Sequence, residues 1–454
     1  IQYILRQMYS VVNLSYMGLS REMEFHADSI AASVSGSLPL ITSLRRLDMA
    51  NECYNTVLNQ LDQMVAENLK SENIYSSHSF MMISNAEELG LPVINELPEI
   101  NKDSFRLYNQ SKLVYKDQWA SHPSTEDRET HLNKLNIKSE NINGIAWLVF
   151  KNPNQLQKEM TEFLYKNVTF TGTPCDLSNE EFKLRINEKR KKYQLHKEYN
   201  GFYENRNISF FDPLKVDEEL KKLHFNDHKE IFTNENKNVI YQIEGLKQDI
   251  FSLEAINKKE LKVKTFEYEG QKFKQADAGE ILKRLQIDLK NKEKDIEILE
   301  ISILNFFLQK AKEKNSSEEL INTYTISCAI FKQSEIDLEY HRDVINLIIP
   351  IYNEALPIEE VNSIMRNVKH KEEFIKKRLE QMLEDIMIKE FLDENKTELL
   401  KKYLSKKWHY YNQSEFDNEA LELFSESMGI YYYIVTELSF KIKKELLDKQ
   451  MSYL

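Results

Sequence analysis

The sequence predicts a mainly helical (mainly α) protein that contains one small β-hairpin. Only 10 glycines and 9 prolines occur among its 454 residues, so few positions favour turns or helix ends. Long stretches rich in Lys, Glu and Leu, which are good helix formers, lie between these breaks. Residues 261–274 differ, because polar and apolar residues alternate there in the pattern of two paired strands.

Three helices are expected in residues 1–70. Gly18 is placed to end the first helix, and Ser20 is a suitable N-cap for the second because its hydroxyl can accept from free backbone N–H groups. The third helix is expected to follow Pro39. Apolar residues recur along it at helical spacing, which predicts a buried face formed by Leu44, Leu47, Val57, Leu61 and Val65.

Residues 71–120 are expected to be less regular, because glycine and proline interrupt them. Helical character returns after Pro123, and a further helix is predicted over residues 153–165. Ser178 and Glu181 have the spacing of a capping box, which predicts the start of another helix.

In the predicted hairpin, residues 261–268 form the first strand and residues 271–274 the second. Glu269 and Gly270 lie between them as a two-residue turn. Asp277 is then placed to cap a long helix. This helix is expected to pack against another helix of the same chain, which we favour over a coiled coil between chains, through the heptad-like series Leu282, Leu285, Leu289, Ile296, Leu299, Ile303 and Phe306.

Two or three helices from about Val361 onward are expected to form a bundle. The run of three tyrosines that begins at Tyr431 is expected to pack rather than to bind a ligand. The predicted core stripe of the bundle consists of Ile375, Leu379, Met382 and Ile386.

Composition excludes some classes of function. The formal net charge is -12, which disfavours a general nucleic-acid-binding role because such proteins carry a basic surface. Cys53, Cys175 and Cys328 are widely spaced and lack metal-ligand spacing, so we expect buried or partly buried thiols in a reducing compartment. No apolar run approaches the roughly 18 residues that cross a bilayer.

Two short segments carry the functional information. Residues 20–28 read SREMEFHAD, in which Glu24 and Asp28 lie four residues apart and therefore on one face of a helix. Residues 121–128 read SHPSTEDR and contain a His-Pro-x-x-x-x-Arg pattern. In sequence and order, the two segments resemble the third-ligand helix and the downstream motif of HtpX-like and CAAX-prenyl-protease-like zinc endopeptidases, family forty-eight of the metallopeptidases.

The resemblance assigns a role to four residues. It implies that Glu24 binds zinc and that Asp28 supports a zinc-binding histidine. It also implies that His122 approaches the metal or the substrate, and that Arg128 pairs with a carboxylate or a substrate carbonyl. The alternative is structural: Glu24 and Asp28 would be solvated helix carboxylates, and His122 and Arg128 would only dock the start of a helix.

A hydrolytic zinc site needs three protein ligands and one open position for water, whose pKa the metal lowers. The His-Glu-x-x-His helix that supplies two ligands and the general base in the family occurs nowhere among the 454 residues. We therefore expect this chain to be inactive alone and to belong to a longer protein. The missing N-terminal region would supply the other ligands and the membrane spans, with the domain on the cytoplasmic side.

The resemblance covers residues 1–143, which are expected to be the C-terminal part of a helical zinc-metallopeptidase domain. Residues 144–454 are expected to form a large helical extension that contains the hairpin, with a break near residues 310–325. The first hypothesis is a membrane-associated zinc endopeptidase that cleaves a protein or peptide substrate, with an extension that screens substrates or binds a helical protein partner. The second is a non-catalytic helical scaffold that retains a peptidase-like fold.

Other histidines are weaker candidates. His224 and His228 lie four residues apart, but their surroundings are charged and no glutamate follows His224. A surface helix or turn is therefore favoured over a metal site. His370 and His409 lie among lysines and aromatic residues and are expected to be structural or exposed.

Overall fold

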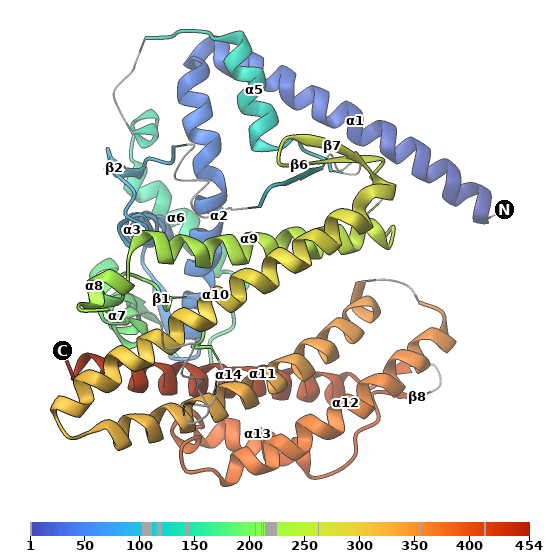
Figure 1. The fold of residues 1–454 in the computed structure, drawn as a ribbon. Helices are drawn as coiled ribbons and strands as arrows, with labels where there is room; N and C mark the ends of the chain where they lie inside the picture. Colours follow the sequence, from blue (N-terminus) through green and yellow to red (C-terminus); the bar gives the residue numbers. More distant parts are fainter. Residues whose placement is uncertain are drawn as a thin grey trace. The chain divides into compact units, whose positions relative to one another are not determined.

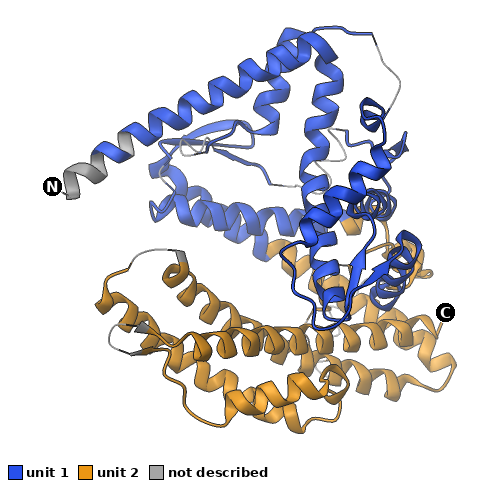
Figure 2. Cartoon of the chain, turned by 180° about the vertical axis from the view of Figure 1, so that it is seen from behind, with its two compact units in different colours: residues 1–194, 238–290 blue, residues 195–237, 291–454 orange. Residues whose placement is uncertain are grey.

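The computed structural model describes residues 2–101, 111–115, 120–140, 145–204, 206–209, 211, 213, 225–261, 263–353, 356–412 and 415–454. The described chain is mainly helical, as predicted (Figure 1). It divides into two compact units (Figure 2). Unit 1 consists of residues 1–194 and 238–290, and unit 2 consists of residues 195–237 and 291–454. The chain therefore passes three times from one unit to the other.

The predicted boundary between residues 143 and 144 lies outside the described residues. The segments on either side of it, 120–140 and 145–194, both belong to unit 1. Of the described helices, none combines the length and the hydropathy that are needed to cross a membrane.

Unit 1 begins with two long helices, α1 (Gln2–Ser35) and α2 (Ser37–Val65). The structure has one continuous α1 where two helices were expected, so the predicted helix end at Gly18 and the predicted N-cap at Ser20 are wrong. A single glycine costs a helix only about 1 kcal/mol, which the many flanking helical residues outweigh. The break comes instead at Gly36, whose φ of 85° lies where glycine is favoured.

The next segment of unit 1 contains a helix that the sequence analysis missed. After β1 (Leu69–Ser71), helix α3 (Ile74–Glu88) begins at Asn73, whose side chain accepts from the backbone N–H groups of the first turn. A two-stranded hairpin follows, formed by β2 (Val93–Ile94) and β3 (Leu97–Pro98). The buried face of α3 mixes apolar and polar residues, so it lacks a clear apolar stripe: Ile74, Ser77, Met81, Met82, Ser84 and Ala86.

Three more helices follow in the described residues of this part of unit 1: α5 (Thr125–Leu135), α6 (Pro153–Tyr165) and α7 (Asn179–Tyr193). The bounds of α6 agree with the prediction, and Ser178 caps α7 by accepting from Glu181 N at 3.1 Å, as expected. Strand β5 (Cys175–Leu177) pairs in parallel with β1. The core between α2, α3, α6 and α7 includes Cys53, Val57, Leu61, Ile74, Leu177, Phe182 and Ile186.

The predicted hairpin is present as β6 (Thr265–Tyr268) and β7 (Gln271–Lys274), but its first strand begins at Thr265 and not at Leu261 as expected. Glu269 and Gly270 have φ angles of 51° and 76°, as a tight two-residue turn requires. A third strand, β4 (Leu113–Tyr115), pairs antiparallel with β6. This pairing was not predicted, because its partners are about 150 residues apart in the sequence.

The sheet packs against α9 (Asn234–Asn257) and the start of α10 (Ala278–Glu313). Asp277 was expected to cap α10, but its carboxylate accepts from the backbone N–H of Lys274 at 2.8 Å. It therefore closes the turn before the helix, a short 3₁₀ segment over Gln275–Asp277.

Unit 2 is built from the remainder of α10 and four further helices: α11 (Ser317–Asn353), α12 (Ile358–Glu384), α13 (Glu394–Leu404) and α14 (Asn418–Met451). Helix α11 packs against both α12 and α14, and α13 packs against α14. The short elements are α8 (His228–Ile231), β8 (Tyr411–Asn412) and β9 (Glu415–Phe416), with 3₁₀ turns at Ala146–Val149 in unit 1 and at Lys197–Tyr199 and Lys389–Phe391 in unit 2.

The predicted core stripe of α12 is correct for Ile375, Leu379 and Met382, which are buried. Ile386 is 82% exposed, so its assignment to the core is wrong. Helix α12 ends at Glu384, and the helical spacing that would have turned this side chain inward stops there. Tyr431 is fully buried, whereas the two tyrosines that follow it are exposed.

Candidate functional site

The two segments that carry the family resemblance meet in unit 1, where α1 contacts α5. Glu24 and Asp28 are one helical turn apart on α1. Helix α5 begins after Ser124, whose hydroxyl accepts from Asp127 N at 3.1 Å. This cap fixes the first turn of α5, which carries Arg128.

Arg128 and Asp28 form a paired contact. Arg128 Nε lies 2.8 Å from Asp28 Oδ2, and Arg128 Nη2 lies 2.6 Å from Asp28 Oδ1. The side chain of Asp28 is only 3% exposed. The hydrogen bonds to Asp28 raise the pKa of Arg128 above its ordinary value. The carboxylate is therefore held in one orientation, because two parallel hydrogen bonds fix both of its oxygens.

Glu24 lies beside this pair. Its Oε2 is 3.5 Å from Arg128 Nη1, and its Oε1 contacts Nδ1 of His122. His122 comes from the loop before α5 and is 73% exposed, whereas Glu24 is 23% exposed. All four residues that the sequence analysis selected thus form one connected cluster of charged and polar side chains.

A second set of contacts supports this cluster, and the sequence analysis did not find it. His131 Nε2 lies 2.9 Å from Ser29 Oγ, and the ring of His131 packs against Phe25 at a centroid distance of 5.1 Å. Both residues lie outside the two motifs: Ser29 directly follows Asp28, and His131 is three residues beyond Arg128. The position of His131 one helical turn from Arg128 was a weak signal that did not identify its partner.

Two arginines connect α5 and the segment before it to neighbouring helices. Arg21 donates from Nη1 to the carbonyl oxygen of Ala120, just before the loop that carries His122. Arg45 of α2 donates to both carboxylate oxygens of Glu129, at 2.6 and 3.1 Å. The segment before α5 is therefore tied to α1, and α5 itself is tied to α2 through Glu129.

The cluster on its own does not make a zinc site. Glu24 and His122 offer two ligand atoms, and they contact each other. In the part of the chain that the structure describes, no group of three or more His, Cys, Asp or Glu side chains could hold a metal ion. Zinc sites need three or four protein ligands. Among the described residues, Glu24 and His122 thus provide fewer ligand side chains than a zinc site needs.

The weaker sequence candidates do not form sites among the described residues. His224 lies outside them. His228 Nε2 lies 2.7 Å from Glu198 Oε2, so this histidine is engaged within unit 2. His370 and His409 are exposed. Of the cysteines, two are buried as expected, but Cys175 is exposed, because it lies at an exposed position of the short strand β5.

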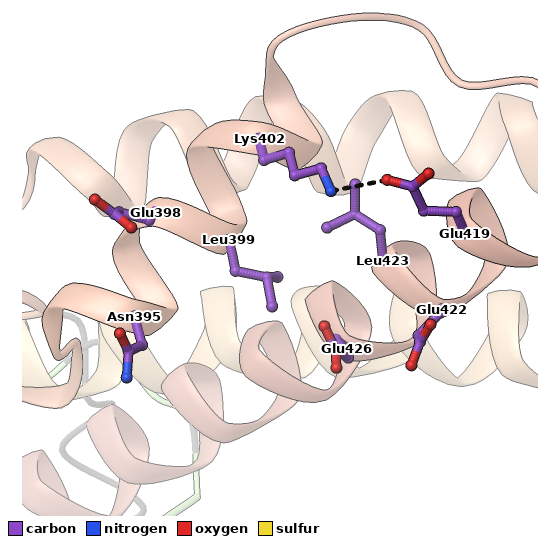
Figure 3. A pocket seen from close by; sticks show the side chains of 8 residues that line it. All are labelled: Asn395, Glu398, Leu399, Lys402, Glu419, Glu422, Leu423 and Glu426. Atoms are coloured by element: carbon purple, nitrogen blue, oxygen red, sulfur yellow. Dashed lines mark hydrogen bonds and ion pairs between the residues drawn. The ribbon is translucent and has the colours of Figure 1, made fainter. Parts of the chain in front are cut away.

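Unit 2 contains a groove that the sequence analysis did not predict. It lies between α13 and α14, has a volume of about 480 Å³, and is lined by Asn395, Glu398, Leu399, Lys402, Glu419, Glu422, Leu423 and Glu426 (Figure 3). Lys402 and Glu419 pair across it at 3.0 Å. The groove is acidic, with four glutamates and one lysine that is already paired.

Comparison of the chain with protein-family models, with curated proteins and with solved structures finds no match. A functional assignment therefore rests on the geometry of the cluster at the α1–α5 contact and on the resemblance of the two segments that form it.

Proposed function

We propose that residues 1–143 are the C-terminal part of a zinc endopeptidase domain, which hydrolyses peptide bonds of a protein or peptide substrate with a zinc-activated water. This chain contributes one metal ligand, Glu24. The remaining ligands and the general base belong to a His-Glu-x-x-His helix outside the 454 residues. Attachment to a membrane would likewise come from outside these residues.

One observation carries the proposal. Glu24 and His122 are 98 positions apart in the sequence, yet their side chains are in contact. Arg128 pairs with the Asp28 carboxylate, which is one of the two roles that the resemblance implies for it. The residues of both motifs therefore form one cluster.

The geometry supports a proposed role for each residue. Arg128 is a positioning residue, since it fixes Asp28 by two hydrogen bonds and approaches Glu24 by a third contact. Glu24 is the carboxylate that remains partly accessible and is available to a metal. His122 is the most exposed member and lies where a substrate could reach it. Asp28 is buried and can orient a neighbouring histidine, as outer-sphere carboxylates do.

The second candidate is a non-catalytic helical scaffold. One observation favours it: within this chain Glu24 and His122 contact each other, so the cluster is also a self-contained connection between α1 and α5. Under this hypothesis the four residues only hold two helices together, and the complete protein binds no zinc.

The test uses the complete natural polypeptide that contains this chain. Zinc is counted by mass spectrometry of the purified protein, and cleavage is followed on an unfolded protein substrate. We expect one zinc per chain, and we expect Glu24→Ala to lower both zinc content and cleavage, the latter by about 100-fold or more, because one of three ligands is lost.

The matched control is Glu22→Ala, which removes an exposed carboxylate from the same helix and should leave both quantities unchanged. A wild-type protein without stoichiometric zinc would refute the peptidase and support the scaffold. Unchanged zinc content in Glu24→Ala would refute the assignment of this ligand.

A further inference from the structure

Helix α1 exposes a row of large apolar side chains. Each is at least 59% exposed, although soluble proteins seldom leave such residues uncovered in a continuous row. The row continues over more than five helical turns and consists of Tyr9, Val12, Tyr16, Leu19, Met23 and Ile30. The N-terminal half of α1 runs away from α2 and α5, so these helices of unit 1 leave much of it uncovered (Figures 1 and 2).

The spacing of the row is that of a helix–helix seam. With His26 included, steps of three and four residues alternate from Tyr9 to Ile30. This alternation places the side chains on one stripe of the helix, which is the pattern of the inner positions of a coiled coil. The residues that flank the stripe are mostly small and uncharged, which permits close approach of a second helix; Glu22 is the charged exception, and the others are Asn13, Ser15, Ser20, Ala27 and Ser29.

We propose that this stripe binds the same stripe of a second copy of the chain, with the two α1 helices antiparallel and the twofold axis at Arg21. In this arrangement, residues at equal distances on opposite sides of Arg21 face each other. The facing pairs are Tyr9 with Ser33, Val12 with Ile30, Tyr16 with His26, and Leu19 with Met23.

The stripe is complementary to itself in this register. At the ends the large Tyr9 meets the small Ser33, and the central layers contain only aliphatic side chains and methionine. Besides Ser33 and the two tyrosine hydroxyls, His26 is the polar side chain of the seam, and it meets the phenol of Tyr16, which can satisfy an imidazole nitrogen. A parallel pair would instead place the two copies of His26 against each other.

The amount of surface is sufficient for a dimer. Six large side chains with these exposed fractions present on the order of 800 Å² together with their flanking residues, which is what one partner contributes to a stable interface. In a dimer with twofold symmetry, each chain buries its own patch against that of its partner. No patch remains exposed to bind a third chain, so association stops at the dimer. This inference rests on α1 alone and is independent of the proposed peptidase function.

The first experiment measures the mass of the 454-residue chain by sedimentation velocity at about 1 to about 100 μM. We expect a dimer of two 53.9-kDa chains. Leu19→Glu places a carboxylate in the central layers and should weaken self-association by about 100-fold or more. Phe251→Glu, at a position of α9 that is 75% exposed, is the control and should remain dimeric. A monomeric wild-type chain over this range would overturn the proposal.

The second experiment tests the register by disulfide formation, in a background in which the exposed Cys175 is replaced by serine. An equimolar mixture of Val12→Cys and Ile30→Cys chains should cross-link under mild oxidation, because these positions face each other. Neither variant alone should do so. Cross-linking of Val12→Cys with itself would show a parallel pair and overturn the antiparallel arrangement.

Discussion

Arg128 connects the two segments of the candidate site through paired hydrogen bonds to a buried carboxylate. Asp28 is 3% exposed, so it has little contact with water that could replace its partner. Loss of one member of such a pair typically costs 3–5 kcal/mol, because the other charge stays buried without compensation. The pair therefore matters for stability whether or not the cluster binds a metal.

This predicts the effect of Arg128→Ala. Local opening of α5 should become easier by about 3 kcal/mol, since Asp28 is left unpaired. Hydrogen exchange of the α5 amides, measured by mass spectrometry, should then be roughly 100-fold faster. Asn133→Ala, an exposed change on the same helix, is the control. An α5 that is equally protected in both variants would contradict the prediction.

At the residue level, the sequence predicted the members of the cluster but not its supports. Glu24, Asp28, His122 and Arg128 belong to patterns with a recognisable spacing. Ser29 and His131 belong to no such pattern, and their contact depends on how α5 lies against α1. A contact between two separate helices requires their packing geometry, which one sequence does not contain.

At the scale of elements, the prediction was most accurate where particular residues mark the end of a helix or a turn. The turn of the β6–β7 hairpin and the bounds of α6 agree with the prediction, because Glu269 and Gly270 mark the turn and Pro153 marks the first residue of the helix. The helix end predicted at Gly18 was wrong because the many helical residues around it outweigh one glycine, which has a low helix propensity. Helix α3 was not predicted because its buried face includes serines. The elements most open to prediction are thus those whose ends are chemically marked.

Two glycines should respond in opposite directions to replacement by alanine. Gly18→Ala should stabilise α1 by about 0.5–1 kcal/mol, because Gly18 is helical and the nearest atom to an added Cβ is 3.9 Å away. Gly270→Ala should cost about 1 kcal/mol, because its φ is +76° although the space around it is open. Thermal unfolding, followed by circular dichroism at one protein concentration, shows whether each variant has a higher or a lower midpoint temperature than wild type. Shifts in the same direction would contradict the assignment of the two conformations.

At the scale of the whole molecule, pairings between distant segments were beyond prediction. Strand β4 pairs with β6 across a large sequence separation. The backbone N–H groups of Lys112, just before β4, and of Leu113 donate to the carboxylate of Asp249 in α9 at 3.0 and 3.3 Å. Nothing local to residues 111–115 indicates either partner. The same is true of unit 2, where Lys443 of α14 donates to the carbonyl oxygens of Tyr203 and Arg206 at 3.1 and 3.0 Å.

The buried Lys443 predicts how stability depends on pH. Burial, with a further contribution from Arg206, lowers the pKa of Lys443 from 10.5 to about 8. Between about pH 8 and pH 10.5 the unfolded chain therefore binds more protons at this residue than the folded chain, and the free energy of unfolding rises with pH. The cost of the buried charge is fully present below about pH 8 and amounts to about 3 kcal/mol.

Lys443→Met removes this dependence. Urea titrations give the unfolding free energies of wild type and variant at each pH. Relative to the variant, the wild type should become more stable by about 2 kcal/mol from pH 7.5 to pH 9.5. A difference that stays constant over this interval would show that the lysine is not buried as a charged group.

The division of unit 1 between two stretches of chain also has a consequence for synthesis. When β4 leaves the ribosome, its partner β6 lies about 150 residues downstream. At about 5–20 residues per second, the delay is roughly 10–30 s. During this time Leu113 and Tyr115 of β4 are present without the residues of α9, β6 and α10 that they pack against in the folded protein. This strand therefore stays without its native core until about residue 290 has emerged.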